Sequence, residues 1–347
     1  MADGPANHYG IEIKHLSKIF GPDARAMVAL AEKGISKTEM LQRHRHVLGL
    51  RDINISVAAG GIQVIMGLSG SGKSTLIRHI NRLVDPTAGE ILVGGEDVVK
   101  MGPRELRAFR RHKTAMVFQK FALLPHRNVL ENTVYGLETQ GVPRAKQVEA
   151  AMHWIARVGL AGFERSYPNQ LSGGMQQRVG LARALANDAP ILLMDEAFSA
   201  LDPLIRMDMQ QVLLGLQREI RKTIVFITHD LDEALRLGDK IAILRDGEII
   251  QQGTSQDIVL KPADDYIANF VKEVNRSRVI RVDAVMSPVQ PGYRLNGASV
   301  ASGSTIEDAI RVAAYEPVTD VAVVSPSGEP LGTVNLRQLA SAVVTRH

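Results

Sequence analysis

A glycine-rich stretch at residues 67–74 reads Gly-Leu-Ser-Gly-Ser-Gly-Lys-Ser and lies between the apolar run 62–66 and a helical pattern. Backbone N–H groups in such a loop can wrap phosphates, and a helix start adds its positive dipole end. In this setting a chance glycine-rich turn is a poor explanation. We predict that Lys73 contacts β and γ phosphates and that the Ser74 hydroxyl ligates Mg²⁺. The residues predicted to bind a nucleotide here are Gly67, Ser69, Gly70, Ser71, Gly72, Lys73, Ser74 and Thr75.

Two adjacent carboxylates, Asp195 and Glu196, close the apolar run 191–194. Asp195 is predicted to hold Mg²⁺, directly or through water, and Glu196 to orient and deprotonate an attacking water. A carboxylate pair at a strand end can instead cap the next helix. The phosphate loop already requires a Mg²⁺ partner, so we interpret the pair as hydrolytic.

A second glycine-rich helix start, Ser172-Gly173-Gly174, has no phosphate loop beside it in the sequence. Its hydroxyl and exposed amides could bind an anion. A simple glycine-rich helix cap would explain the same residues, so the residue types alone leave both readings open.

Composition favours a globular protein of two domains. The chain has 347 residues, 45% of them hydrophobic and 22% charged, and it contains no cysteine. Disulfides and thiolate metal sites are therefore excluded. The net charge is +4, but the basic residues are scattered, so no nucleic-acid partner is expected. No apolar stretch approaches the roughly 20 residues of a membrane span, and a membrane would be reached through partners.

Short apolar runs alternate with helical stretches from residue 11 to about 274, which predicts an α/β fold with a mostly parallel sheet. Residues 21–49 form an unusually long insertion with two helix-like pieces, and 36–39 has capping-box spacing. A second, smaller α+β unit follows at 279–347, with a predicted helix at 305–314, strands at 320–324 and 331–334, and a short closing helix from 336. The predicted domains are therefore 1–275, including the insertion, and 279–347.

Residues 11–274 resemble an ABC-type ATPase, because the phosphate loop, the stretch Leu-Ser-Gly-Gly-Met-Gln-Gln-Arg at 171–178 and the acidic strand end occur in that family's order. The resemblance implies a RecA-like P-loop core, an antiparallel β subdomain and a helical subdomain. It also implies that Ser172, Gly173 and Gly174 bind the γ-phosphate held by the opposite subunit. Two ATP molecules would then bind only in a homodimer.

Other positions match the family one at a time. Gln119 resembles the glutamine that senses Mg²⁺ and the attacking water, Asp202 closes a segment similar to the D-loop, and His229 resembles the switch histidine at the γ-phosphate. Phe20 stands where an aromatic usually stacks on adenine, although the insertion separates it from its usual strand and it could simply pack. Tyr9 is the alternative.

Three features together resemble the ATPases of glycine betaine/proline-type importers: the insertion 21–49, the stretch 196–206 and a trailing small domain. The last domain is similar to a single CBS repeat. Longer members of this subfamily carry two repeats, which are associated with osmotic or ionic-strength regulation. A lone repeat could equally be a packing or dimerisation module.

The resemblance implies an ATP-hydrolysing, Mg²⁺-dependent subunit that powers import of a quaternary amine such as glycine betaine, proline betaine or choline, or of proline. The implied partners are a second copy, two integral membrane permease subunits and, indirectly, a periplasmic or extracellular substrate-binding protein. The implied location is peripheral, on the cytoplasmic face of the bacterial inner membrane. The alternatives are import of an amino acid such as histidine, a soluble ABC ATPase without a transport role, and a nucleotide-binding module that does not hydrolyse ATP.

Overall fold

The computed structural model describes residues 8–119, 121–289, 297–315 and 320–344. Contacts along the chain divide it into two compact units. The first comprises Met1–Asp230 and Leu237–Ile250, and the second comprises Leu231–Arg236 and Gln251–His347. The expected domain limits, 1–275 and 279–347, stay predictions, because a grouping of contacts does not test which segment folds independently.

An antiparallel sheet in the first unit has the strand order β2-β1-β4-β5. Its strands are β1 Ile11–Phe20, β2 Val47–Val57, β4 Ala88–Val93 and β5 Glu96–Asp97. In β1, the buried Ile11 and Ile13 alternate with exposed residues, as in a sheet with one face on the core. The strand ends at Phe20, which pairs with Val47.

A six-stranded sheet carries the residues that could do chemistry. Its strand order is β10-β9-β3-β8-β7-β6, with β3 Ile62–Met66, β6 Thr114–Val117, β7 Ile191–Asp195, β8 Thr223–Thr228, β9 Lys240–Arg245 and β10 Glu248–Gly253. The pairs β3–β8, β3–β9, β7–β8 and β6–β7 are parallel. Met66 is level with Thr228, and Asp195 with Ile227. The residues that follow β3, β7 and β8 therefore gather at one sheet edge, where ligands bind in open α/β sheets.

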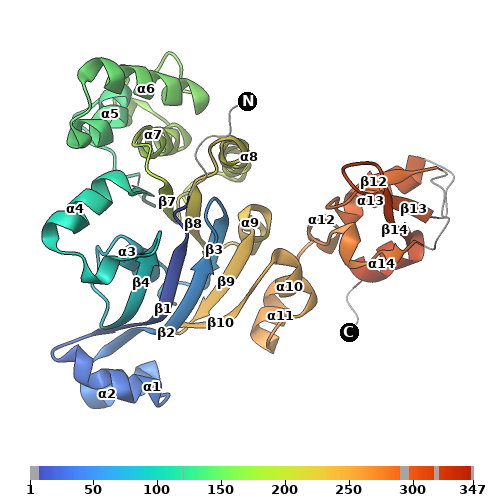
Figure 1. Ribbon diagram of the computed structural model, residues 1–347, viewed down its shortest axis with the longest axis horizontal. Helices are drawn as coiled ribbons and strands as arrows, with labels where there is room; N and C mark the ends of the chain where they lie inside the picture. Colours follow the sequence, from blue (N-terminus) through green and yellow to red (C-terminus); the bar gives the residue numbers. More distant parts are fainter. Residues whose placement is uncertain (1–7, 120, 290–296, 316–319, 345–347) are drawn as a thin grey trace. The chain divides into compact units, whose positions relative to one another are not determined.

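Apart from the short helices of the insertion 21–49, the helices of the first unit fall into two groups (Figure 1). α5, α6 and α7 pack on one another as a helical subdomain, with bounds Val129–Gln140, Arg144–Arg157 and Gly173–Ala186. The others are α3 Lys73–Ile80, α4 Pro103–His112 and α8 Pro203–Ile220, with 3-10 turns at Val98–Lys100 and Pro168–Gln170. The predicted α/β class with a parallel core, an antiparallel sheet and a helical subdomain is confirmed. Within the described residues, no helix has the length and apolarity needed to span a membrane.

The insertion 21–49 folds into a 3-10 turn, Ala24–Met27, and two short helices, α1 Val28–Glu32 and α2 Lys37–His44. The Ser36 side chain accepts a hydrogen bond from the Glu39 N–H, as the capping-box spacing predicts. An apolar cluster joins the insertion to the antiparallel sheet, and its buried members are Ala31, Met40, Ile19 of β1 and Leu48 of β2. It is therefore a packed element of the first unit.

The second unit contains a four-stranded sheet of order β11-β14-β13-β12. Its strands are β11 Ser287–Pro288, β12 Ser299–Ala301, β13 Asp320–Val324 and β14 Pro330–Asn335. Its helical segments are α9 Leu231–Leu237 (up to Arg236), α10 Ser255–Leu260, α11 Asp265–Val271, α12 Arg276–Val279, a 3-10 turn Val282–Ala284, α13 Ile306–Tyr315 and α14 Leu336–Val343. β12 runs parallel to β13, and α13 connects them. The sequence predicts α13, β13, β14 and α14 but not the short β11 and β12.

Candidate nucleotide-binding site

The phosphate loop leaves β3 after Met66 and enters α3 at Lys73. Gly70 and Gly72 adopt φ angles of 79° and 111°, a region that favours glycine, and Gly72 is the N-cap of α3. The buried Lys73 ammonium donates to the carbonyl oxygens of Gly67 at 2.8 Å and Leu68 at 3.1 Å. The ammonium is thus fixed at the start of α3, where its charge and the N–H groups of the helix start favour an anion.

A hydroxyl and a carboxylate meet beside this loop. Ser74 Oγ donates to Asp195 Oδ1 at 2.8 Å, and Arg78 Nη2 lies 3.3 Å from the other carboxylate oxygen. Oxygen donors of these two kinds, together with phosphate oxygens, are what Mg²⁺ prefers. Ser74 and Asp195 therefore fit the metal role predicted for them. Arg78 was not predicted, although its position one helical turn after Ser74 on α3 places both side chains on one face.

Glu196 lies at the centre of the polar groups of the site. Its Oε1 is 3.4 Å from Lys73 Nζ, and its Oε2 accepts a hydrogen bond from Gln119 Nε2 at 3.0 Å. His229 Nδ1 lies 3.5 Å from the same Oε2. The Gln119 amide also donates to Ser199 Oγ at 3.4 Å. Side chains that follow β3, β6, β7 and β8 thus converge on one carboxylate that remains partly open to solvent.

A cavity of about 670 Å³ opens beside these groups, a volume typical of small-molecule sites. Phe20 stands in its wall, and its ring lies close over Gly49, where an added Cβ would come within 2.9 Å of the ring. The Lys18 ammonium is 4.9 Å from the centre of the same ring. The remaining lining residues are Lys37, Thr38, Leu41, Gln42, Val47, Leu48, Gly49, Ser69, Gly70, Gly72, Lys73, Ser74, Thr75, Gln119 and Glu196.

Not every predicted residue lines this cavity. Gly67, Ser71, Asp195 and His229 are outside its described lining, but each adjoins or contacts a lining residue. Of the described residues that line the cavity, none belongs to the Ser172-Gly173-Gly174 stretch, and Asp202 is also outside it. Ser172 Oγ instead accepts from the Met175 N–H at 3.3 Å as the N-cap of α7. Asp202 is the N-cap residue of α8 without a side-chain cap bond. Within one chain, these residues have the geometry of helix starts and no contact with the phosphate loop's cavity.

The insertion's share of the wall was not predicted. Lys37, Thr38, Leu41 and Gln42 all come from α2. Their spacing, two pairs four residues apart, places them on one helix face. The sequence carries that spacing, but nothing in it indicates that this face turns toward the phosphate loop.

Comparisons with known proteins agree with this geometry. The ABC transporter family model matches residues 50–199. The chain is 53% identical over 276 residues to the glycine betaine transport ATP-binding protein OpuAA of Bacillus subtilis (strain 168), covering 80% of this chain and 66% of that relative. It is 42% identical over 337 residues to the trimethylamine N-oxide transport system ATP-binding protein TmoW of Pelagibacter ubique (strain HTCC1062), covering 97% of this chain and 98% of that protein.

The chain belongs to the ABC transporter family. A solved dimeric structure of an ATP-binding cassette from this family, in a post-hydrolysis state bound to ADP and Pi, is also similar. It has a TM-score of 0.60 at 32% sequence identity, and the match covers 71% of this chain and 98% of the other. The similarity to a known cassette therefore extends over most of this chain.

Proposed function

We propose that this chain is the ATP-hydrolysing subunit of an importer for a small methylated amine. The observation that carries the hydrolytic part is the convergence of Lys73, Gln119 and His229 on the Glu196 carboxylate, within 3.5 Å, beside the phosphate loop. The similar ATP-binding proteins of transport systems support ATP as the nucleotide.

The roles follow from the positions of the donors. Backbone N–H groups of the phosphate loop and the Lys73 ammonium bind the β and γ phosphates. Bound to Ser74 and Asp195, with Gln119 nearby, a Mg²⁺ ion would neutralise phosphate charge. Gln119 and Glu196 orient the attacking water, and Glu196 accepts its proton. His229 donates a hydrogen bond to the γ-phosphate, and Phe20 stacks on adenine.

A second copy completes each site in this proposal. Ser172, Gly173 and Gly174 are outside the cavity of their own chain, so they are available to the γ-phosphate of a facing copy. Leu204, two residues after Asp202, is 80% exposed at the start of α8. Ile205 and Met207 nearby are 38% and 46% exposed. A group of exposed apolar side chains beside the D-loop segment supports an interface there. The similar cassette is dimeric.

Replacing the proposed base tests the hydrolytic function. Glu196→Gln keeps the side chain's size but removes the proton acceptor, so ATP turnover should fall by about 10² or more while ATP still binds. The matched control is Glu219→Gln, an exposed ion-pair residue of α8, which should keep normal turnover. Near-normal hydrolysis by Glu196→Gln would reject Glu196 as the base.

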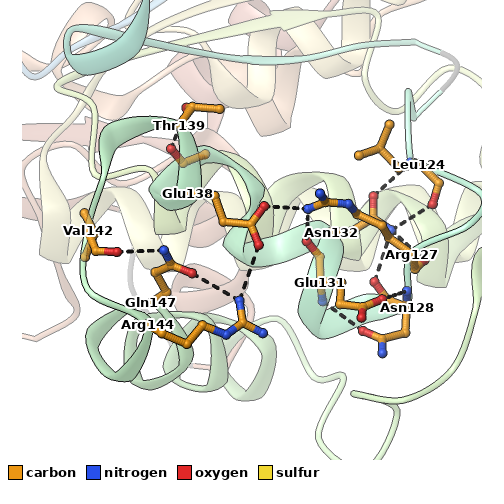
Figure 2. Close-up of polar contacts among 11 residues, drawn as sticks. Leu124, Arg127, Asn128, Glu131, Asn132, Glu138, Thr139, Val142, Arg144 and Gln147 are labelled. Carbon is orange, nitrogen blue, oxygen red and sulfur yellow. Dashed lines mark hydrogen bonds and ion pairs between the residues drawn. The ribbon is translucent and has the colours of Figure 1, made fainter.

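Two membrane permease subunits are the proposed partners, and residues 119–132 are the proposed contact; residue 120 lies outside the described part. Figure 2 shows how this segment is held. The buried Asn132 amide donates to the carbonyl oxygens of Leu124, Arg127 and Asn128 and accepts from the Leu124 N–H. Arg127 is in turn paired with Glu138 at 2.6 Å. A preorganised surface loop of this kind suits docking of a short helix.

The cargo is proposed from the relatives. Glycine betaine is the first candidate because OpuAA is a glycine betaine transport ATP-binding protein. Proline betaine and choline are methylated amines of the same kind, and proline, which has no methyl group on nitrogen, is the amino-acid alternative. Trimethylamine N-oxide is a second candidate, favoured by the match to TmoW along nearly the whole chain. ATP-driven uptake by the reconstituted importer, with these solutes and histidine competing and Glu196→Gln as inactive control, decides between them. Uptake won by proline or histidine would remove the methylated-amine proposal.

The assembly would place this chain peripherally on the cytoplasmic face of the bacterial inner membrane, fed by a substrate-binding protein outside. The end of the chain is proposed to be a single CBS-like repeat, supported by the order β12-α13-β13-β14-α14. If it is regulatory, deleting residues 279–347 should change the salt or nucleotide dependence of transport. Unchanged dependence would leave a structural role.

A further inference from the structure

Helix α2 of the insertion has two different faces. One face is buried: Met40 is fully covered in a cluster with Ile19, Ala31 and Leu48. The opposite face lines the cavity beside the phosphate loop, through Lys37, Thr38, Leu41 and Gln42. An amphipathic helix usually presents its second face to solvent alone. Here that face is one wall of the nucleotide cavity.

The helix is held firmly in this position. Its first turn is capped by Ser36, and the Arg51 guanidinium binds both the Ile35 carbonyl oxygen and the Glu248 carboxylate, the latter at 2.6 Å. Its last turn ends on Arg45, whose N–H donates to the Leu41 carbonyl oxygen at 3.0 Å. A wall fixed by packing, caps and a half-buried ion pair can position side chains for a ligand.

Lys37 brings a second cation to the phosphate loop. Its ammonium lies 3.4 Å from the Gly70 carbonyl oxygen. Partial burial lowers the pKa of this ammonium, whereas the charges of Asp246 and Glu248 act in the opposite direction. In the described residues, neither carboxylate forms an ion pair with Lys37 within 4 Å, and Glu248 is paired with Arg51 instead. An anion in the cavity would supply the charge that Lys37 lacks at short range.

The other end of the same wall is apolar and open. Phe20, Leu41 and Val47 all line the cavity, and they are 42%, 53% and 50% exposed. Three large apolar side chains left exposed around one cavity favour a flat, weakly polar group between them. The wall is therefore cationic near the phosphate loop and apolar near Phe20, in the order of a nucleotide's phosphates and base.

We propose that α2 is a nucleotide-binding element: Lys37 contacts the phosphate chain of ATP beside Gly70, and Leu41 covers the base on the side opposite Phe20. This inference rests on the proposed function, because it assigns further binding residues to the same ATP site. It gives the insertion a direct part in nucleotide affinity.

The test is ATP binding by the full-length chain, measured by calorimetry with Lys37→Gln and the matched control Arg43→Gln. Both variants remove one cation from α2, but Arg43 is exposed and pairs with Glu39 outside the cavity. Losing one charged hydrogen bond to phosphate should weaken ATP binding by about tenfold in Lys37→Gln. The control should stay within about twofold, as for other exposed pairs. Lys37→Arg should retain most of the affinity.

Two further readings separate binding from folding. The Tm of ATP-free Lys37→Gln should equal that of the wild type, while its ATP-induced rise in Tm should be smaller. Leu41→Ala should weaken ATP and ADP binding equally, because both carry the same base. A fall in ATP-free Tm that accounts for the lost affinity would overturn the inference, since α2 would then be only structural.

Lys73→Ala distinguishes this inference from the proposed function. If Lys73→Ala loses ATP binding while Lys37→Gln binds like the wild type, the role of α2 is wrong and the ATP site stands. If Lys73→Ala also binds ATP normally, the proposed site is wrong, and the role of α2 is wrong with it.

Discussion

Two glycine-rich helix starts, alike in composition, differ in what their glycines do. Before α3, Gly70 and Gly72 adopt left-handed φ angles and bend the chain into a phosphate-sized loop. Before α7, Gly173 and Gly174 lie in the first helical turn, and Ser172 caps it. The first helix start needs glycine for its backbone conformation. In the second, the glycines lack side chains, so the N–H groups of the first helical turn stay accessible.

This difference is informative about function. The first helix start brings Lys73, Ser74, Asp195 and Glu196 together within its own chain, so half of the proposed ATP site is assembled there. The second helix start, Ser172-Gly173-Gly174, is not among the described residues that line the cavity of the same chain. The free N–H groups of such a helix start can bind a phosphate that is held by a second copy of the chain.

The largest expected effect separates the two kinds of glycine. A Cβ at Gly67 would lie 2.2 Å from the Leu244 backbone oxygen, so Gly67→Ala should lower the free energy of unfolding by about 3 kcal/mol or more. At Gly174 the first obstacle is Ile205 Cγ2 at 2.6 Å, the end of a partly exposed side chain that can turn away. Gly174→Ala should cost less than about 1 kcal/mol. Urea unfolding of both variants measures this, and equal losses would remove the distinction.

The next prediction asks whether the two starts form one site across a dimer. Lys73→Ala and Ser172→Ala should each reduce ATP turnover by about 10² or more, since each damages every site of its homodimer. Mixing equal amounts of the two proteins should restore turnover to about a quarter of the wild-type value, because half of the random dimers then contain one intact site of two.

The matched control is a mixture of Lys73→Ala with Glu196→Gln. Both changes lie on the phosphate-loop side, so no dimer of these two chains contains an intact site. Recovery in this mixture, or no recovery in the first, would contradict a site shared between copies.

The sequence predicts the first half of the site better than its wall. Gly67, Lys73, Ser74 and Asp195 follow strands that read as buried apolar runs, and the carboxyl ends of parallel strands meet at one edge. The order of strands along the chain therefore predicts that these residues lie close together at that edge. The wall formed by α2 depends on how an insertion packs onto the antiparallel sheet, which local periodicity does not determine.

For the secondary structure of the second unit, the length of an element decides whether the sequence predicts it. α13, β13, β14 and α14 are long enough to show their period. The predicted limits of the first three and the predicted start of α14 agree with the structure to about one residue. β11 has two residues and β12 three, too few for an alternating pattern, and each is a strand only through its partner.

The smallest expected effect concerns one buried polar side chain on each of the two helices. α3 carries the fully buried His79, whereas α7 carries the fully buried Gln177, which does not titrate. Burial is the main cause that lowers the pKa of His79 to about 4. The Lys18 charge acts in the same direction, and the bond to the Thr75 carbonyl oxygen and the Asp85 charge oppose it.

The sign of the pH effect follows from this direction. The unfolded chain binds a proton at His79 near pH 6.5, and the folded chain only near pH 4. Stability is therefore full above the unfolded pKa and falls as the pH drops toward 4, by about 2 kcal/mol at pH 5. His79→Gln should remove that part of the fall between pH 8 and pH 5, as measured by urea unfolding at both values. The exposed His153 on α6 provides the control, His153→Gln, which should leave the fall unchanged. If His79→Gln and the wild type lose equal stability between pH 8 and pH 5, His79 is not a cause of the acid sensitivity. In that case α3 and α7 do not differ in this respect.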